Sequence, residues 1–597
     1  MDKIELKNKI RALEGLTNEE KSALIELLNH QKKYGLVWED KSEAVEERLR
    51  DELPILHEVK ERAIISEADD APNHILIEGD NLEALTALSY THAGKIDVIY
   101  IDPPYNTGNK DFVYNDSFVD SEDSFRHSKW LSFMDRRLKL AKLLLSDTGG
   151  VIFISIDDNE QAQLKLLCDE LFGSNNFVAD VIWKHTQQSK NDELHFSRQY
   201  NYTLCYAKHK EYLHRFYFER TDEDNKNYKN PDNDPRGPWR SGDVRSPNFR
   251  KTLCFSITAL NGNVIPAPQN GWRWSELSIQ EKIRTGEIIF KSDGTGIIRK
   301  IYLCNQTGRT PENLWEGPRF GTTRQAAANI KDIFEGEQVF DTPKPYELIM
   351  RIEEISSSKD STILDFFAGS GTTLHATMQL NAEDGGHRKC ILVTNNENSI
   401  CENVTYERNK RVINGYTTPK GEAVEGLHAN TLRYYRTDFI SRDQSPRNMR
   451  ALVAASTDLL CIKNDIYTEA PLAGKQLNKK IARYFEDKRS RMLVIYDERA
   501  IAAIVNLLET VETDSRGRIK VYTFSPSRYA FDDEFMEVAD KVELCALPAA
   551  IYDAYKQALP KRKPKFLPEA LVEGEATETK NEAHQGELNF DTEGGNQ

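Results

Sequence analysis

The sequence contains no apolar run of about 18 residues, the length that a membrane-spanning helix needs, so we expect no transmembrane segment. Its first residues, Met1 to Lys7, include no apolar signal core, which disfavours secretion. The eight cysteines stand singly, and none belongs to a Cys-x-x-Cys pair. This spacing disfavours zinc sites and is typical of the reducing cytoplasm, where we expect the protein to act without a metal.

Basic residues are also in short supply, because 79 Lys and Arg face 95 Asp and Glu, which gives a formal net charge of −16. Taken alone, that balance argues against nucleic acid as a partner. Net charge is a weak guide, however, because affinity for DNA depends on a local basic face. The 597 residues, 39% of them hydrophobic and 29% charged, predict a soluble globular protein of several domains.

The most informative residues are Asp102-Pro103-Pro104-Tyr105. They follow residues 95–101, a short apolar segment typical of a buried parallel strand, and ligands bind at the carboxyl ends of such strands. The prolines fix φ and lack N–H groups, so the turn is stiff and its carbonyls are free to accept hydrogen bonds. Asp102 and the Pro103 carbonyl suit the two hydrogens of an exocyclic amine, and Tyr105 suits stacking on a flat base. The alternative is an ordinary turn with a capping Asp.

A second segment predicts a strand that ends at Asp365 and turns into a helix. Glycines at such a turn let a ligand approach the backbone at the positive end of the helix. The full Gly-x-Gly-x-x-Gly fingerprint is not present, since residue 374 is Leu, and a packing turn is the alternative. The predicted binding residues of this segment are Asp365, Phe366, Phe367, Ala368, Gly369, Gly371 and Thr372.

The first segment resembles the catalytic tetrad of amino-methyltransferases, which methylate the N6 of adenine or the N4 of cytosine in DNA. Asp-x-Phe-x-Gly-x-Gly resembles the S-adenosyl-L-methionine loop of the same enzymes, and the order tetrad-then-loop resembles their β class. Over nearly its whole length, the chain is similar to the modification (Mod) subunits of type III restriction-modification systems. That similarity rests on residues 32–39, 106–116, 406–408 and 432–439.

The resemblance implies further cofactor contacts. Asp80, Asn81 and Leu82 would receive the adenine of the cofactor, Lys344 would pair with the carboxylate of its methionine part, and Glu397 would bind the ribose hydroxyls. For each acid taken alone, a solvated strand end is the alternative.

Residues 209–335 match the target-recognition domain of that family in position. Between residues 236 and 252, five basic residues accompany one acid, Asp243, and aromatic residues are interleaved with charge there and at Trp272 and Trp274. Arginine pairs with guanine edges and stacks on bases, so the segment is suited to DNA. The alternative is a loop-rich surface domain whose tryptophans fill a small core. The predicted DNA contacts are Asn106, Lys110, Arg236, Trp239, Arg240, Arg245, Arg250 and Arg273.

Alternating strand and helix patterns predict an α/β fold, a doubly wound and mostly parallel sheet like that of Rossmann-like S-adenosyl-L-methionine-dependent methyltransferases. The expected divisions are 1–70 (helical), 71–208 (catalytic half), 209–335 (target recognition), 336–416 (cofactor half), 417–568 (an α/β domain for subunit contacts) and 569–597 (a disordered acidic tail).

The leading hypothesis is a sequence-specific DNA adenine-N6 methyltransferase that uses S-adenosyl-L-methionine, flips its target base, and serves as a type III modification subunit. Implied partners are double-stranded DNA, a second copy of the chain and a restriction (Res) helicase–nuclease subunit. Alternatives are a solitary methyltransferase and a non-catalytic DNA-binding specificity subunit. N4-cytosine transfer is disfavoured, because that group more often carries Ser where Asp102 stands.

Overall fold

A computed structural model of the chain describes residues 10, 15, 17, 21 and 36–561, except 110, 116 and 190–193. Nearly all of residues 1–35 of the expected N-terminal helical segment, the predicted DNA contact Lys110 and the predicted tail 569–597 therefore lie outside the described residues.

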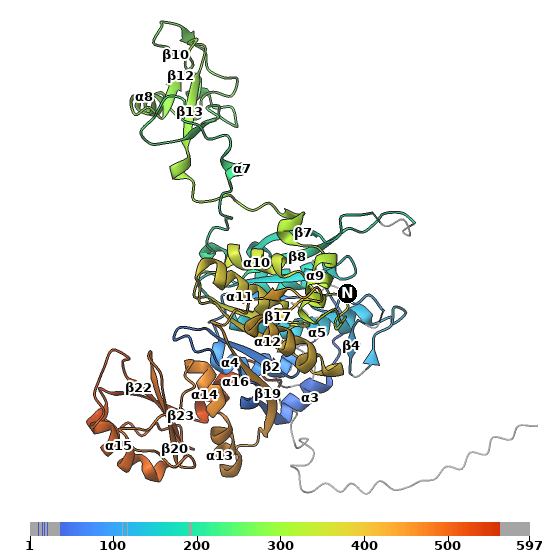
Figure 1. Cartoon of the computed structure of the whole chain (residues 1–597), viewed down its shortest axis with the longest axis vertical. Helices are drawn as coiled ribbons and strands as arrows, with labels where there is room; N and C mark the ends of the chain where they lie inside the picture. The colour runs from blue at the N-terminus through green and yellow to red at the C-terminus, as the bar shows by residue number, and fades with distance from the viewer. Residues whose placement is uncertain are drawn as a thin grey trace, which may run out of the picture.

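The main body is built around one large sheet (Figure 1). From β19 to β6 in its order every neighbouring pair is parallel, whereas β1 and β8 run antiparallel to their neighbours. The predicted doubly wound, mostly parallel sheet is thus confirmed. In sheet order, the strands within the described residues are β1 (Glu52–Glu58), β19 (Thr431–Ser441), β2 (Asn73–Glu78), β16 (Lys389–Thr394), β15 (Thr362–Asp365), β3 (Val98–Ile101), β6 (Val151–Ile156), β8 (Tyr200–Ala207), β7 (Phe177–Lys184) and β14 (Leu314–Trp315).

Helices cover both faces of this sheet. Successive side chains of a strand point to opposite faces, so the apolar strands give the sheet two hydrophobic faces that must be covered. In β2, Ile75 and Ile77 belong to one hydrophobic core and Leu76 to the other. The first core is covered by α3 (Ala44–Asp51), α4 (Asn81–His92), α5 (Arg126–Leu144) and α6 (Gln161–Cys168), and the second by α9 (Thr323–Ile333), α10 (Tyr346–Ser356), α11 (Thr372–Asp384) and α12 (Glu407–Asn414).

The neighbouring strands β3 and β15 are followed by helices on opposite faces, α5 on one and α11 on the other. This divergence is the topological switch point at which open α/β sheets bind their ligands.

One element differs from the sequence expectation. Residues 52–58, inside the segment 1–70 expected to be helical, form strand β1 at the edge of the main sheet. Leu53, Ile55 and Leu56 of β1 are fully or almost fully buried. This apolar run is stabilised as a strand because it pairs with β19 and packs on α4. The burial outweighs the helical expectation that the charged residues on either side of the run had given.

Residues 219–308 form a projecting unit, which stands apart from the main body in Figure 1. Chain entry and exit are joined by Phe218 and Arg309, whose backbones exchange hydrogen bonds of 2.8 and 2.9 Å. The unit has its own small core around Trp272, Ile279 and Ile288. Its elements are α7 (Asp222–Asn225), β9 (Trp239–Gly242), β10 (Ile257–Thr258), β11 (Val264–Ile265), α8 (Glu276–Arg284), β12 (Ile288–Phe290) and β13 (Ile297–Tyr302).

A smaller α/β region follows β19. Its four-stranded sheet has the order β20-β21-β22-β23. The elements are α13 (Pro446–Ala455), α14 (Thr457–Asn464), β20 (Ala482–Glu486), β21 (Arg491–Ile495), α15 (Ile501–Glu509), β22 (Ile519–Phe524), β23 (Val542–Leu547) and α16 (Ala549–Tyr555). Among the described residues, no helix has both the length and the apolar character required to cross a bilayer.

Candidate active site

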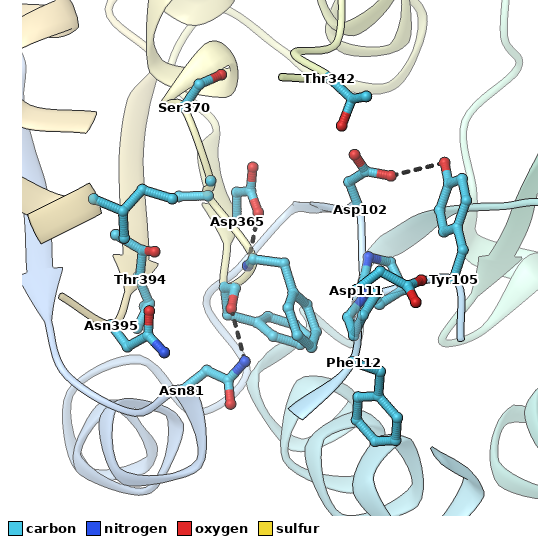
Figure 2. A pocket seen from close by; sticks show the side chains of 18 of the residues that line it. Asn81, Asp102, Tyr105, Asp111, Phe112, Thr342, Asp365, Ser370, Thr394 and Asn395 are labelled. Carbon is cyan, nitrogen blue, oxygen red and sulfur yellow. Dashed lines mark hydrogen bonds between the residues drawn. The ribbon is translucent and has the colours of Figure 1, made fainter. Parts of the chain in front are cut away.

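A cavity of about 860 Å³ opens at the switch point, at the carboxyl ends of the central strands (Figure 2). All four residues of the tetrad (residues 102–105) line one side of the cavity. The glycine loop (residues 365–373), which is distant from the tetrad in sequence, lines the other side. Two further predicted residues, Leu82 and Gly371, form no part of the described wall. The predicted cofactor residues that do line it are Asp80, Asn81, Lys344, Asp365, Phe366, Phe367, Ala368, Gly369, Thr372 and Glu397.

The tetrad begins one residue after β3 ends, and it is held by side chains from elsewhere. Tyr105 Oη donates a hydrogen bond of 2.9 Å to Asp102 Oδ1, drawn in Figure 2. Trp130 of α5 donates through Nε1 to the Pro104 carbonyl over 2.7 Å. Burial, with the nearby Asp102 carboxylate, raises the pKa of Tyr105 well above its ordinary 10.0. Tyr105 therefore remains a neutral donor, and Asp102 keeps one fixed orientation.

Lys344 lies in the cavity wall beside the tetrad. Its Nζ donates to Asp102 Oδ2 over 2.5 Å and lies 5.1 Å from the centre of the Tyr105 ring. Pairing of this lysine with the cofactor carboxylate stays a prediction. The structure shows that it forms an ion pair with Asp102 of the tetrad.

The glycine loop is shaped by its own acid and by two residues in left-handed backbone conformation. Asp365 Oδ1 accepts from the Phe367 backbone N–H over 2.9 Å, and Oδ2 accepts from Thr373 Oγ1 over 2.5 Å. Gly369 and Gly371 have φ of +49° and +74°. A Cβ at Gly371 would collide with the Asn409 side-chain amide, so only glycine fits there.

Three side chains from beyond β16 fasten the loop from behind. Thr405 Oγ1 donates to the Gly369 carbonyl over 2.6 Å, and Asn409 Nδ2 donates to the Gly371 carbonyl over 3.2 Å. Arg408 Nη1 donates to Thr372 Oγ1 over 2.6 Å. In the sequence, Arg408 belongs only to a segment that resembles the family. The one sequence signal for its role as an anchor is that this charged residue stands among the residues of α12 that face the core.

Burial sets the electrostatics beneath the loop. It raises the pKa of Asp365 to about 7, to which the charge of Asp102 adds a smaller effect. Burial likewise raises the pKa of Glu353, which accepts from Thr377 directly behind the loop, to about 8. It lowers the pKa of Arg408 to about 10. Two buried acids, Asp365 and Glu353, thus lie beneath the loop with almost no exposure to solvent.

The start of α4 forms the next part of the wall. Asp80 caps the helix by accepting from the Leu82 backbone N–H over 2.7 Å. Asn81 Nδ2 donates to the Phe366 carbonyl over 3.0 Å, and Arg137 Nε donates to Asn81 Oδ1 over 2.5 Å. Leu82 is buried, so only its backbone serves the site. Arg137, which no local pattern singles out, connects α5 to this wall.

Glu397 follows β16 and begins a short turn in which Asn398 and Ser399 have positive φ of 52° and 60°. Thr394 and Asn395, both labelled in Figure 2, continue the same wall from the end of β16.

The rest of the wall was not predicted. Phe133 lies 5.2 Å from the Phe112 ring centre and 5.8 Å from that of Phe367, which gives an aromatic side. Beyond Tyr105 the lining residues are Asp157, Trp183, His185, Asn201 and Thr323. Asp157 directly follows β6, so the strand-end rule that identified Asp102 would have found it.

Asn106 and the projecting unit hold the predicted DNA contacts. Asn106 is fully buried, with φ +57°, and its Nδ2 donates to Glu160 Oε1 over 2.5 Å. It therefore shapes the turn after Tyr105 instead of facing solvent. Burial raises the pKa of Glu160 to about 8.

None of the predicted contacts on the projecting unit lines the cavity. Trp239 is buried and donates to Asp232 over 2.8 Å, which agrees with the alternative of a small core. Arg236 and Arg245 pair with neighbouring aspartates at 3.0 and 2.9 Å. Arg240, Arg250 and Arg273 are exposed on its surface.

Comparison with known proteins also separates the part of the chain that forms the cavity from the rest. The family model described as DNA methylase matches residues 96–414, which include both the tetrad and the glycine loop. The StyLTI Mod subunit of a type III restriction-modification enzyme from Salmonella typhimurium is 38% identical over 54% of this chain and 52% of its own length. The chain therefore spans about half of that relative.

Two other relatives are covered more fully. The type II methyltransferase M.KpnI from Klebsiella pneumoniae is 35% identical over 59% of this chain and 88% of its own length. The EcoP15I Mod subunit from Escherichia coli is 26% identical over 86% of this chain and 88% of its own length.

Among solved structures, the PvuII cytosine-N4-specific DNA methyltransferase is 13% identical with a TM-score of 0.31, covering 60% of this chain and 98% of its own. A likeness at that level is too weak to identify the fold, which is shown instead by the order and direction of the strands described above. The family rests on the matched residues 96–414 and on the relative M.KpnI. The chain belongs to the DNA methylase family.

Proposed function

We propose that the protein transfers a methyl group from S-adenosyl-L-methionine to the N6 of an adenine flipped out of duplex DNA. One observation carries the proposal: the tetrad and the glycine loop line a single cavity. A volume of about 860 Å³ lies in the upper range of ligand pockets, which suits a nucleoside cofactor and an extruded base side by side.

The residues on the loop side fit the cofactor. Glu397 suits a ribose diol, and the backbone at Gly369 is bare enough for close approach. Phe367, Asp80 and Asn81 complete a surface for a flat adenine and its polar edge. When bound, S-adenosyl-L-methionine supplies an electrophilic methyl group on a sulfonium.

The chain's own residues deal with the target base. Its extrusion costs about a few kcal/mol, which stacking on Tyr105 partly offsets. Asp102 and the Pro103 carbonyl accept the amine hydrogens and aim the nitrogen lone pair. The catalytic contribution is orientation in a water-poor cavity, since no proton has to be removed before the nitrogen attacks.

We further propose that the chain is the modification subunit of a type III system, with double-stranded DNA, a second copy of itself and a Res helicase–nuclease as partners in the cytoplasm. Support comes from the relatives named Mod subunits, above all the EcoP15I subunit, which this chain matches over most of its length. The projecting unit is then the target-recognition part, with Arg240, Arg250 and Arg273 toward DNA, and residues 417–568 serve subunit contacts.

A solitary methyltransferase is the alternative that the sequence left open, and the relatives named Mod subunits do not favour it. A reading frame for a helicase–nuclease beside this one, whose product copurifies with the chain, would decide for the type III assignment.

The test is modified-base sequencing of DNA from cells that express the chain, the Asp102→Ala variant or the Glu383→Ala variant. Methyladenine at one sequence motif is expected with the unchanged chain and with Glu383→Ala, which alters an exposed acid of the main body outside the cavity. None is expected with Asp102→Ala. Methylcytosine, or no modified base from any of the three, would refute the proposal.

A further inference from the structure

Two proline-bounded segments meet inside the cavity. Asp102 precedes Pro103 and Pro104, while Lys344 lies between Pro343 and Pro345. Proline fixes its own φ and restricts the residue before it to extended conformations. Both partners of the 2.5 Å ion pair therefore stand on stiff backbone, although the segments come from different halves of the sheet.

The pair is also shielded. The Lys344 side chain is 12% exposed and that of Asp102 is 25% exposed. A lysine that only neutralised a surface acid would keep its ammonium group in water, where such pairs are weak. Lys344 instead turns inward, which leaves its ammonium group committed to this carboxylate.

The carboxylate is fixed at both oxygens, because Oδ1 accepts from Tyr105 and Oδ2 from Lys344. A carboxylate offers about four acceptor positions, so two partners leave room for an amine hydrogen in a defined direction. The other charged and titratable groups that act on Asp102 and Tyr105 are Asp365, Tyr100 and Asp157.

We propose that Lys344 is a positioning residue for Asp102: it orients the carboxylate and compensates its charge, so that Asp102 aligns the target amine and does not act as a general base. The inference rests on the proposed function and deepens it.

The charge flow of the reaction makes such a role sufficient. The amine nitrogen forms a bond to the methyl carbon while the carbon–sulfur bond breaks and its electron pair stays on sulfur. Positive charge thus moves from sulfur to nitrogen, with no new net charge in the cavity. The surplus proton of the methylated nitrogen then passes to water, so the step needs an aligned acceptor more than a strong base.

The experiment compares Lys344→Met, Lys344→Arg and a control, Lys389→Met, which breaks another half-buried ion pair, with Asp465, that forms no part of the described cavity wall. Calorimetry with S-adenosylhomocysteine measures cofactor-site affinity, and single-turnover methylation of DNA measures the chemical step.

For Lys344→Met we expect the dissociation constant to change by less than about threefold while the chemical step slows about 100-fold. Lys344→Arg should recover at least about tenfold of that loss, because it keeps the charge. Lys389→Met should match the unchanged chain in both measurements.

A second comparison separates this role from simple misfolding. Lys344→Met leaves a partly buried carboxylate unpaired, so it should lower the thermal midpoint. In an Asp102→Asn background that carboxylate is gone, and Lys344→Met should cost little further stability.

The inference is overturned if Lys344→Met weakens S-adenosylhomocysteine binding more than about tenfold with an unchanged chemical step, which would make Lys344 a ligand of the cofactor carboxylate. Equal destabilisation in both backgrounds would overturn it as well. In either case the unchanged chain still methylates DNA, so the proposed function stands.

Discussion

Two turns at the same edge of the sheet achieve precision in opposite ways. The turn after β3 contains two prolines, and the turn after β15 contains two glycines with positive φ. Proline removes backbone freedom, so the tetrad presents side chains and carbonyls in fixed directions. Glycine removes the side chain, so the loop presents bare backbone that a ligand can approach.

The supports of the two turns differ accordingly. Single hydrogen bonds from Trp130 and Lys344 hold the proline turn, which is already stiff. The glycine loop has intrinsic freedom and is fixed by a group of buried side chains, namely Thr405, Arg408 and Asn409. A mutation should therefore harm chemistry at the first turn and folding or ligand binding at the second.

The largest expected effect comes from the functional group of the proline turn. Asp102→Ala should reduce methylation by at least about 1,000-fold, because the oriented acceptor for the amine is lost. Binding of S-adenosylhomocysteine should change little, since the loop side is untouched. Filter binding and single-turnover assays check both statements, and turnover equal to that of the unchanged chain would remove Asp102 from the mechanism.

The glycine loop should respond in stability instead. Gly371→Ala forces a Cβ against Asn409 and strains φ, which should cost about 3 kcal/mol in unfolding free energy and most of the cofactor affinity. The matched control is Gly385→Ala, with φ +67° and open space around the new methyl, for which about 1 kcal/mol is expected. Denaturant unfolding of both variants measures the difference, and equal losses would contradict the collision.

The acids beneath the loop predict how stability depends on pH. The folded-state pKa of Asp365 is raised from 3.8 to about 7, so between those values the folded chain holds a proton that the unfolded chain has lost. Stability should therefore fall as pH rises through 7, and Glu353 extends the fall toward pH 8.

Histidine gives the opposite trend at lower pH. Burial lowers the pKa of His74 from 6.5 to about 4, so stability should rise with pH across that window. Because two raised acids outweigh one lowered histidine, thermal midpoints are expected to fall as pH rises from about 5 to 8. Asp365→Asn should make this fall shallower, and an unchanged slope would show that this carboxyl is not the source.

The smallest effect is expected when a stiff turn loses part of its stiffness. Pro103→Ala keeps the carbonyl and needs no new backbone angle, so unfolding free energy should fall by about 1 kcal/mol or less. Methylation should slow by only a few-fold. Chemical denaturation and steady-state rates test this, and a loss as large as that of Asp102→Ala would mean that proline does more than restrict φ.

Sequence alone predicted the parts of the site that are contiguous. The strands ending at Ile101 and Asp365 are apolar and short, the turns carry recognisable residues, and parallel strands bring their carboxyl ends to one edge. That is enough to bring Tyr105 and Gly369 to one cavity.

Sequence did not predict contacts whose direction depends on tertiary packing. Arg137 and Arg408 are charged residues on helices, and nothing local distinguishes a buried anchor from a solvated side chain. Asn106 was expected to meet DNA, but its left-handed backbone turns the amide toward Glu160. For Lys344, the segment was identified correctly as part of the site, whereas its partner is set by how α10 packs against β3.

The joining of Phe218 to Arg309 has an evolutionary consequence. Because the chain leaves and re-enters the main body through one pair of backbone hydrogen bonds, the stretch between them behaves as a cassette whose ends keep their spacing whatever it contains. If the projecting unit reads DNA as proposed, exchange of that stretch would change the recognised sequence and leave the residues of the cavity unaltered.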